Sequence, residues 1–376
     1  MNKKLSTLLK MILLSMGLIA LVSVASKSMS GNEALDDKAE ATGHYFAMGT
    51  SISISIYSDD ESLDKTALME NIAEDIKLLD EQLISWRSSE SELGRINTMG
   101  GGSTIISTEL YVALKQSLDI CRHSKGALDI TIRPLAALWN IEGDSNEEFT
   151  PPTKEEVETA LEQVDYESVS LLSETYNTTS SKDNSKQKEA TNINYYVTFS
   201  RDDTILDLGA TGKGYALDRA KAILDEKGVD GALITVGGSI LVYGEKSDGK
   251  PWRIGVRDPN KPNDTTAVIG YIELPSGSKT CISTSGGYEK YKTYQGKDYH
   301  HILDSKTGYP ANSGLLSVTV VCENGLASDG LSTACYVLGY EKSLPLLKMY
   351  DAQAVFMDTN GDIIVTEGLI DSWVEK

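Results

Sequence analysis

Residues 207–243 read DLGATGKGYALDRAKAILDEKGVDGALITVGGSILVY. The segment opens with a glycine-rich turn and continues with a helix predicted over 215–227. It ends with apolar runs at 232–236 and 240–243, on either side of Gly237-Gly238. One helix is thus followed by two strands that only a short glycine turn separates. Together with the elements predicted elsewhere, this order favours a mixed α+β domain over a regular βαβ alternation.

The rest of the chain continues the mixture of helices and strands. Apolar runs, one with strict alternation of Ser and Ile, predict strands at 51–57, 252–256, 267–274, 315–322, 354–357 and 363–366. Apolar spacing predicts helices at 109–125, at 327–338 and along the stripe Leu68, Ile72, Ile76, Leu79 and Leu83. Thr153 and Glu156 have the spacing of a capping box and predict a further helix start.

The composition is that of an ordinary globular protein with an excess of acidic residues. The 376 residues include 35 Lys+Arg and 55 Asp+Glu, so the formal net charge is −20, and 40% are hydrophobic. The length allows one large domain or two of medium size. The charge argues against binding to nucleic acid or to anionic lipid, so an anionic ligand would need a local basic pocket. Four histidines without an HExxH or CxxC pairing argue against a zinc site of the usual kinds.

The N-terminus has the pattern of an export signal. Lys3, Lys4 and Lys10 precede an uncharged, mostly apolar run over residues 11–26, and Ser23-Val24-Ala25 offers small residues for cleavage. As a helix this run would span about 24 Å, short of the ~30 Å hydrocarbon core of a bilayer. We expect residues 1–26 to be a signal peptide or an N-terminal anchor, followed by a linker over 27–44. The protein would then be exported and extracytoplasmic, at the cell surface or associated with the membrane, without a lipoprotein cysteine.

The cysteines do not define a disulfide framework. Four of them are widely spaced among apolar neighbours, at Cys121, Cys281, Cys322 and Cys335. Outside the cytosol they could pair, but four cysteines allow three pairings and the sequence does not select one. Buried free thiols are an equally good alternative.

One segment has the composition of a disordered insertion. Residues 173–194 contain Ser, Thr, Asn, Lys, Glu and Gln and almost no apolar side chain. Such a segment buries too little surface to offset its ordering entropy, which predicts a disordered surface insertion. A domain linker is the alternative, but the next predicted strand, at 195–200, leads directly into the glycine-rich turn.

Two loops carry candidate functional residues. In the glycine-rich turn, Lys213 follows a strand end where backbone N–H groups can meet a phosphate, although neither a P-loop nor a GxGxxG is present. A tight turn with an exposed lysine is the alternative there. The stretch HHILDSKTGYP over residues 300–310 gathers His, Asp, Lys and Thr, which indicates either a site or a structural loop.

A third candidate lies on the helix predicted over 327–338. Asp329 and Thr333 stand four residues apart, so a carboxylate and a hydroxyl share one face of this helix. A carboxylate with neutral oxygens suits Mg²⁺, which keeps few protein ligands. The alternative is an acidic residue in a first turn that favours the helix dipole.

The order of these and other short motifs resembles the FAD:protein FMN transferase family (ApbE-like flavin transferases). The matching stretches fall within about residues 45–340: Met48-Gly49-Thr50, Ser91-Glu92-Leu93, Ile96-Asn97, Gly126-Ala127-Leu128-Asp129-Ile130-Thr131, Pro134, Leu138-Trp139, 207–218, Gly237-Gly238, Thr284-Ser285-Gly286, 301–310 and 327–333. The sequence departs from the family pattern at Ser305, where proline is usual, at Gly287, where Asp or Asn is common, and in the insertion.

The resemblance implies a single large catalytic domain, residues 45–376, of the α+β class with T-fold-like antiparallel sheets packed against helices. It implies an enzyme that takes FAD as substrate and Mg²⁺ as cofactor. FMN would be joined by a phosphoester to a Ser or Thr hydroxyl of a client FMN-binding protein domain, with release of AMP. By position, the metal would be held by Asp329, Thr333 and the carbonyl of Ala210. The FAD site would be lined by Met48, Trp86, Ala127, Leu128, Asp129, Asp207, Lys213 and Ile302.

The same residues suggest catalytic roles. A client hydroxyl is a poor nucleophile, and His301 is the candidate general base because imidazole titrates near neutral pH, with Asp304 as the alternative. Lys213 would add positive charge beside the phosphates, and Trp86 and Met48 offer apolar faces to a flavin or adenine ring. Two other functions stay open. They are hydrolysis of FAD to FMN and AMP, and flavin binding without turnover, which the joint presence of Asp329 and Thr333 disfavours.

Overall fold

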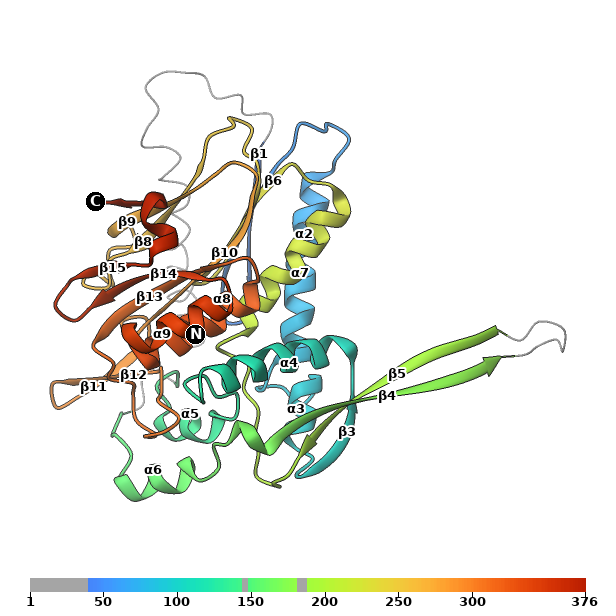
Figure 1. The fold of residues 1–376 in the computed structure, drawn as a ribbon, viewed down its shortest axis with the longest axis vertical. Coiled ribbons are helices and arrows are strands. Elements are labelled where there is room, and N and C mark those ends of the chain that lie inside the picture. Colours follow the sequence, from blue (N-terminus) through green and yellow to red (C-terminus); the bar gives the residue numbers. More distant parts are fainter. Residues whose placement is uncertain (1–39, 144–147, 181–187) are drawn as a thin grey trace, which may run out of the picture.

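The computed structural model describes residues 40–143, 148–180 and 188–376, which are arranged around a large antiparallel sheet (Figure 1). Within these residues eight strands form the sheet in the order β1-β2-β6-β7-β10-β13-β14-β15. Every neighbouring pair in it is antiparallel. The strands are β1 (Glu40–Ala47), β2 (Thr50–Tyr57), β6 (Gly231–Val236), β7 (Ser239–Gly244), β10 (Ser278–Gly286), β13 (Leu315–Cys322), β14 (Gln353–Asp358) and β15 (Ile363–Val365).

Helices cover one face of the large sheet and bury the main hydrophobic core against it (Figure 1). Ile52, Ile54 and Ile56 of β2 are fully buried there. A shift of β2 by one residue would turn all three away from the core, so the alternating pattern fixes the register of this strand. The helices that contribute to this core are α2 (Lys65–Leu78), the π-helical turn η1 (Leu79–Ile84), α3 (Glu92–Asn97), α4 (Thr108–His123), α7 (Gly212–Lys227), α8 (Gly325–Leu338) and α9 (Tyr340–Met349).

A small sheet covers the other face and buries a second core. It has the strand order β16-β9-β8. Its elements are β8 (Trp252–Arg257), β9 (Val268–Leu274), η3 (Glu367–Ser372) and β16 (Trp373–Glu375). Leu233, Val242 and Ile282 of the large sheet pack in this core with Trp252. The predicted fold class is therefore confirmed: helices and antiparallel sheets form the layers of one α+β domain.

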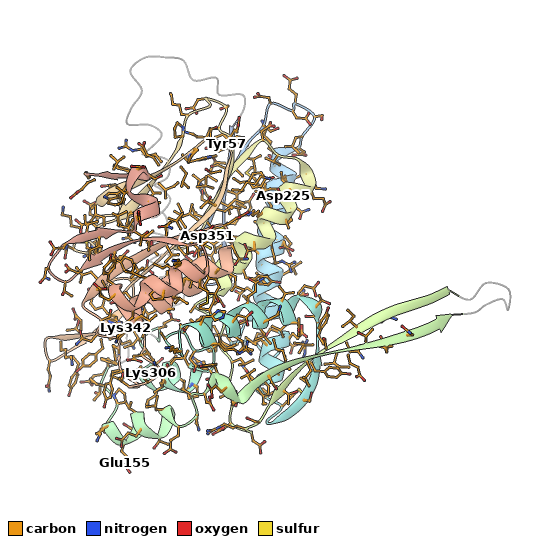
Figure 2. The ribbon with its side chains drawn as sticks, in the orientation of Figure 1. Tyr57, Glu155, Asp225, Lys306, Lys342 and Asp351 are labelled. Carbon is orange, nitrogen blue, oxygen red and sulfur yellow. The ribbon has the colours of Figure 1, made fainter. Side chains whose placement is uncertain are left out.

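A third, smaller cluster lies at the end of the molecule where α5 (Arg133–Trp139) and α6 (Lys154–Leu161) pack together. The hairpin of β11 (Tyr291–Tyr294) and β12 (Lys297–His300) lies beside it (Figure 1). The predicted capping box is present at the start of α6, where Glu156 N–H donates to the Thr153 hydroxyl and Thr153 N–H donates to the Glu156 carboxylate. Glu155, in the same turn, is exposed at the outer edge of the molecule (Figure 2).

The prediction of a disordered insertion over residues 173–194 is wrong where the structure describes that segment. Strands β4 (Val169–Ser180) and β5 (Lys188–Phe199) pair without a break in an antiparallel ribbon that extends away from the body (Figure 1). β3 (Gly102–Ile106) joins the base of the ribbon, and η2 (Tyr166–Ser168) leads into it. Cross-strand hydrogen bonds pair the backbone groups that face each other, so the ribbon can form without a core of its own. Residues 181–187 lie outside the described residues.

Several predicted boundaries also need correction. The linker predicted over 27–44 ends before residue 40, because Glu40–Ala47 pair with β2, and the domain begins there rather than at residue 45. α7 begins at Gly212 and α8 at Gly325, earlier than predicted, and the sequence did not indicate β10. The signal peptide or anchor predicted over residues 1–26 lies outside the described residues. None of the helices in the described part of the chain is long and apolar enough to cross a membrane.

All four cysteines are buried and have free thiols. Of the two alternatives left open by the sequence, the structure thus has buried thiols and not disulfides. Cys281 and Cys322 occupy opposite positions on β10 and β13. Cys121 and Cys335 lie in α4 and α8 on the helical side of the sheet. Burial raises the pKa of the Cys335 thiol to about 12, so this cysteine is protonated and unreactive at neutral pH.

Candidate active site

A side chain of α7 and close backbone packing hold the first two turns of α7 against the start of α8. Asp218 of α7 accepts hydrogen bonds from the N–H groups of Gly325 (2.6 Å) and Leu326 (2.8 Å), which have no partner within α8. The helices cross at Gly214 and Gly325, and a Cβ atom on either glycine would overlap the carbonyl oxygen of the other. This crossing brings Asp329, one turn further along α8, against the glycine-rich turn.

Asp329 is a buried carboxylate, with 5% of its side chain exposed. Its Oδ2 accepts a hydrogen bond from Gly214 N–H at 3.0 Å, and its Oδ1 accepts one from the Ser239 hydroxyl at 3.3 Å. Lys213 Nζ lies 3.4 Å from Oδ1. A positive charge therefore stands directly beside the predicted metal ligand.

Lys213 connects α8 to the glycine-rich turn. Its Nζ donates to the carbonyl of Gly209 at 3.4 Å in addition to its contact with Asp329. Burial alone would lower the pKa of Lys213, but the carboxylates of Asp329 and Glu289 outweigh burial and raise that pKa above its usual value. The side chain is therefore charged at neutral pH.

The oxygens predicted to bind a metal lie in one region. Thr333 follows Asp329 by one turn of α8, and its Oγ1 is 3.2 Å from Ser285 Oγ. Ala210 lies in the turn before α7 and lines the same cleft. Among the described residues no group of three or more His, Cys, Asp and Glu side chains could hold a metal ion. A metal here would take one carboxylate with neutral oxygens and complete its shell with water or substrate, which fits Mg²⁺.

Asp207 begins the glycine-rich turn. Its Oδ1 accepts a hydrogen bond from Gly209 N–H at 2.7 Å, and its own N–H donates to the carbonyl of Ile130 at 2.7 Å. Burial raises the pKa of Asp207, while Gly209 N–H and the nearby Arg133 oppose the rise. Asp207 thus shapes the turn and ties it to the loop over residues 127–131.

Asp129 orders this second loop. Its Oδ1 accepts hydrogen bonds from the N–H (2.8 Å) and hydroxyl (2.6 Å) of Thr131, and its Oδ2 accepts one from Tyr166 N–H at 3.2 Å. Burial raises the pKa of Asp129, against the effect of these hydrogen bonds. Both carboxylate oxygens have partners within the protein, so Asp129 holds the loop in shape, with Ala127 and Leu128 also lining the cleft.

Met48 is positioned by the hairpin of β1 and β2. Met48 and Gly49 form its turn with φ angles of 54° and 69°, the left-handed pair that suits a tight hairpin. Met48 N–H donates to Asp80 Oδ2 at 3.0 Å, which fixes this turn against η1. Met48 lines the cleft as predicted.

Trp86 also lines the cleft, but two guanidinium groups lie over its ring. Arg133 Cζ is 3.3 Å from the ring centroid and Arg87 Cζ is 4.2 Å from it. The indole was expected to offer a bare apolar face to a ring of FAD. In this structure that face is in contact with arginine instead.

His301 directly follows β12. Its Nδ1 is 3.2 Å from the carbonyl of Lys290, a group that only accepts, so Nδ1 carries the proton and Nε2 keeps its lone pair. Burial and the positive charge of Lys290 lower the pKa of His301 to about 4, against the opposing effect of Glu142. The imidazole is therefore neutral at pH 7 and has the lone pair of a general base, with lower basicity than an exposed histidine.

The loop after His301 is tied to the loop that precedes Asp129. Ile302 is buried, and its carbonyl accepts a hydrogen bond from Ala311 N–H at 2.9 Å. The Ser305 hydroxyl donates to the carbonyl of Gly126 at 2.5 Å. Serine thus fixes the loop through its side chain at a position where the family pattern has proline.

A single cleft of about 540 Å³ joins the loops and helix ends described above. The predicted site residues that line it are Met48, Trp86, Ala127, Leu128, Asp129, Asp207, Ala210, Lys213, His301, Ile302, Asp329 and Thr333. The structure therefore brings every one of them together, while their individual roles stay predictions. The lining has six carboxylates (Asp80, Asp129, Glu142, Asp207, Glu289, Asp329) and four cationic side chains (Arg87, Arg133, Lys213, Lys290).

Sequence reasoning missed six charged residues of the cleft, namely Asp80, Arg87, Arg133, Glu142, Glu289 and Lys290. Lys290 Nζ lies 2.7 Å from Glu142 Oε1, and Arg87 Nη2 lies 3.2 Å from Glu142 Oε2. Arg133 could have been suspected from the sequence, because it is the only charged residue besides Asp129 in the stretch 127–138. No local pattern pointed to Glu142 or Lys290, because their pairing joins distant parts of the chain.

The sequence and the α+β fold of this domain match those of a known family. The model of the ApbE family matches residues 48–356, and the chain belongs to this family. The resemblance drawn from the short motifs is thereby confirmed. A curated FAD:protein FMN transferase of Klebsiella pneumoniae is 31% identical, over 85% of this chain and 89% of that protein. One of Treponema pallidum is 27% identical over 86% of each chain. The crystal structure of the ApbE protein of Thermotoga maritima matches with a TM-score of 0.74 and 30% identity, over 89% of this chain and 99% of that one.

Proposed function

We propose that this protein is an Mg²⁺-dependent FAD:protein FMN transferase, which moves the FMN part of FAD to a Ser or Thr hydroxyl of a client protein and releases AMP. The observation that carries the proposal is the meeting of Asp329, Thr333 and Lys213 in one cleft with the other residues predicted to line the FAD site. The curated relatives named above carry the name of this enzyme.

At phosphorus the reaction breaks one P–O bond and forms one. The client hydroxyl oxygen attacks the phosphorus on the FMN side of the pyrophosphate, and the bond from this phosphorus to the bridging oxygen breaks. AMP leaves with the bridging oxygen, and the hydroxyl proton passes to Nε2 of His301. Reactions of this kind depend on positioning and on neutralising phosphate charge.

The chain supplies a fitting set of ligands for Mg²⁺. Asp329, Thr333 and the carbonyl of Ala210 would hold the ion, which when bound supplies positive charge to the phosphate oxygens. Because carboxylates outnumber cations in the cleft lining, the pyrophosphate of FAD requires such additional charge. Lys213, charged and 3.4 Å from Asp329, adds to it from the protein side.

The proposal is tested by incubating the purified full-length chain with FAD, Mg²⁺ and an FMN-binding acceptor domain. We expect the intact mass of the acceptor to rise by one FMN phosphoester, with release of AMP, and EDTA to abolish both. An acceptor whose Ser or Thr is replaced by Ala serves as the control. AMP and free FMN without a mass gain would indicate hydrolysis of FAD, and no AMP at all would leave a flavin-binding protein.

Replacing His301 by glutamine is expected to lower kcat about 10²- to 10⁴-fold, the usual contribution of a general base. The charged and titratable groups that face His301 are Lys290, Glu142 and His300. Because the pKa of His301 lies at about 4, His301 stays deprotonated between pH 7 and pH 5. The wild-type rate should therefore not fall with a midpoint near pH 6.5 as the pH is lowered. Rates measured across that range, with the surface variant His123→Gln as control, check both expectations.

Two outcomes would contradict this role. An unchanged kcat in His301→Gln would remove the base assignment, and a wild-type rate that falls with a midpoint near pH 6.5 would contradict the lowered pKa. The same pKa has a consequence for stability. The unfolded chain takes up a proton at His301 below about pH 6.5 and the folded chain only near pH 4, so this histidine makes the fold less stable as pH falls through that window.

We also propose that the chain is exported and that its client is an extracytoplasmic protein. The support is the lysine-flanked apolar run within residues 1–26. The mass of the mature chain would decide between a cleaved signal peptide and a retained anchor.

A further inference from the structure

Arg133 stands out among the cleft residues because its donors are unused. Its guanidinium is half-buried and lines the cleft. No described residue accepts a hydrogen bond from it or pairs with it in a salt bridge. The guanidinium contacts the ring of Trp86, with Cζ 3.3 Å from the ring centroid. Arg87, by contrast, is paired with Glu142.

The short distance to Trp86 defines the orientation of the Arg133 side chain. At 3.3 Å the guanidinium must lie flat on the indole, since an edge-on group would push its N–H hydrogens into the ring. A flat guanidinium keeps its five N–H donors in its own plane, free of the ring. This is the form in which arginine binds two oxygens of a phosphate at once.

The surroundings keep Arg133 charged. Burial lowers its pKa, but the neighbouring Asp207 carboxylate opposes this, and an arginine stays protonated at neutral pH in any case. Asp207 also begins the glycine-rich turn whose Gly209 carbonyl contacts Lys213. Arg133 thus lies near the turn that leads to Lys213 and Asp329.

We propose that Arg133 binds the pyrophosphate of FAD and that Trp86 acts by holding Arg133 flat, rather than by stacking on a ring of FAD. This rests on the proposed function and deepens it, because it assigns a substrate contact that the motifs do not contain. Arg133 is then a substrate-binding residue, and Trp86 is a positioning residue.

Equilibrium binding to the full-length chain, with EDTA present, tests the assignment. Riboflavin carries the same ring as FAD without phosphates, so it separates ring contacts from phosphate contacts. Arg133→Gln is expected to weaken FAD binding about 10- to 100-fold, the range for a lost charged hydrogen-bonding pair. Riboflavin affinity should stay the same, and Arg133→Lys should retain part of the FAD affinity. Arg122→Gln, which removes a surface arginine of α4, is the matched control for the change in net charge.

The role of Trp86 is tested by a double-mutant cycle. Trp86→Leu should weaken FAD binding in the wild-type background and have little further effect in Arg133→Gln. Equal losses in both backgrounds would show that Trp86 acts on its own and would overturn the positioning role.

Two results would overturn the assignment of Arg133. One is unchanged FAD affinity in both Arg133 variants. The other is an equal loss of FAD and riboflavin, which would make Arg133 a ring contact. Failure of the wild-type chain to bind FAD when Mg²⁺ replaces EDTA would instead overturn the proposed function itself. Thermal unfolding of each variant verifies that it is folded under the conditions of the binding measurement.

Discussion

Replacing Asp329 by asparagine is expected to lower the transfer rate about 10³-fold or more, since a bound metal contributes several kcal/mol of charge stabilisation. Asparagine has nearly the same shape, so it can keep a contact with Ser239, whose hydroxyl lies 3.3 Å from Oδ1. It removes the negative charge that Mg²⁺ requires. Initial rates of AMP release and titration of Mg²⁺ binding by calorimetry measure the effect.

A matched control is available on α7. Asp225 is also a carboxylate in an ion pair, with Lys279 Nζ at 2.5 Å, but it lies at the far end of the helix on the surface (Figure 2). Asp225→Asn should therefore leave turnover and Mg²⁺ affinity unchanged. A folded Asp329→Asn protein with full Mg²⁺-dependent activity would remove the metal assignment.

Replacing Gly214 by alanine is expected to destabilise the fold by about 1–3 kcal/mol, the usual cost of overpacking. The added Cβ would overlap the backbone carbonyl of Gly325 and lie 2.8 Å from Cβ of Asp329. Neither atom can move without shifting α8, so turnover should fall together with stability. Thermal unfolding and the rate of AMP release check the two effects.

Gly212→Ala is the control for this substitution, since it lies in the same turn of α7. Its Cβ would meet only the ends of flexible side chains, Ile84 Cδ1 at 2.9 Å and Met48 Cε at 3.3 Å. Alanine also favours a helix over glycine by about 1 kcal/mol, which offsets part of any crowding. If Gly214→Ala unfolds at the same temperature as Gly212→Ala, the two helices separate more easily than their crossing indicates.

Features that depend on neighbouring residues could be predicted from the sequence. The capping box of α6 and the alternation in β2 are encoded within a few positions, and both were found where expected. The predicted site residues could be selected because each lies in a short motif whose order along the chain matches a family. Their meeting in one cleft follows from the fold and not from any single motif.

Features that depend on distant parts of the chain could not be predicted. The composition of residues 173–194 indicated disorder, but strand pairing needs only a partner with the right register, and β5 provides one for β4. The contact between Trp86 and Arg133 joins a loop to the start of α5, so neither residue alone reveals that a guanidinium covers the indole. The half-buried position of Lys213 beside Asp329 likewise depends on the crossing of α7 and α8.

The crossing at Gly214 and Gly325 bears on how this protein could be redesigned for other acceptors. Asp218 holds the backbone of α8, and the two glycines leave no space between the helices. Mutational libraries should therefore keep residues 212–218 and 324–333 constant. Diversity is better placed in the hairpin of β11 and β12, which pair only with each other within the described chain and directly precede His301. Changes there leave the contacts between α7 and α8 untouched.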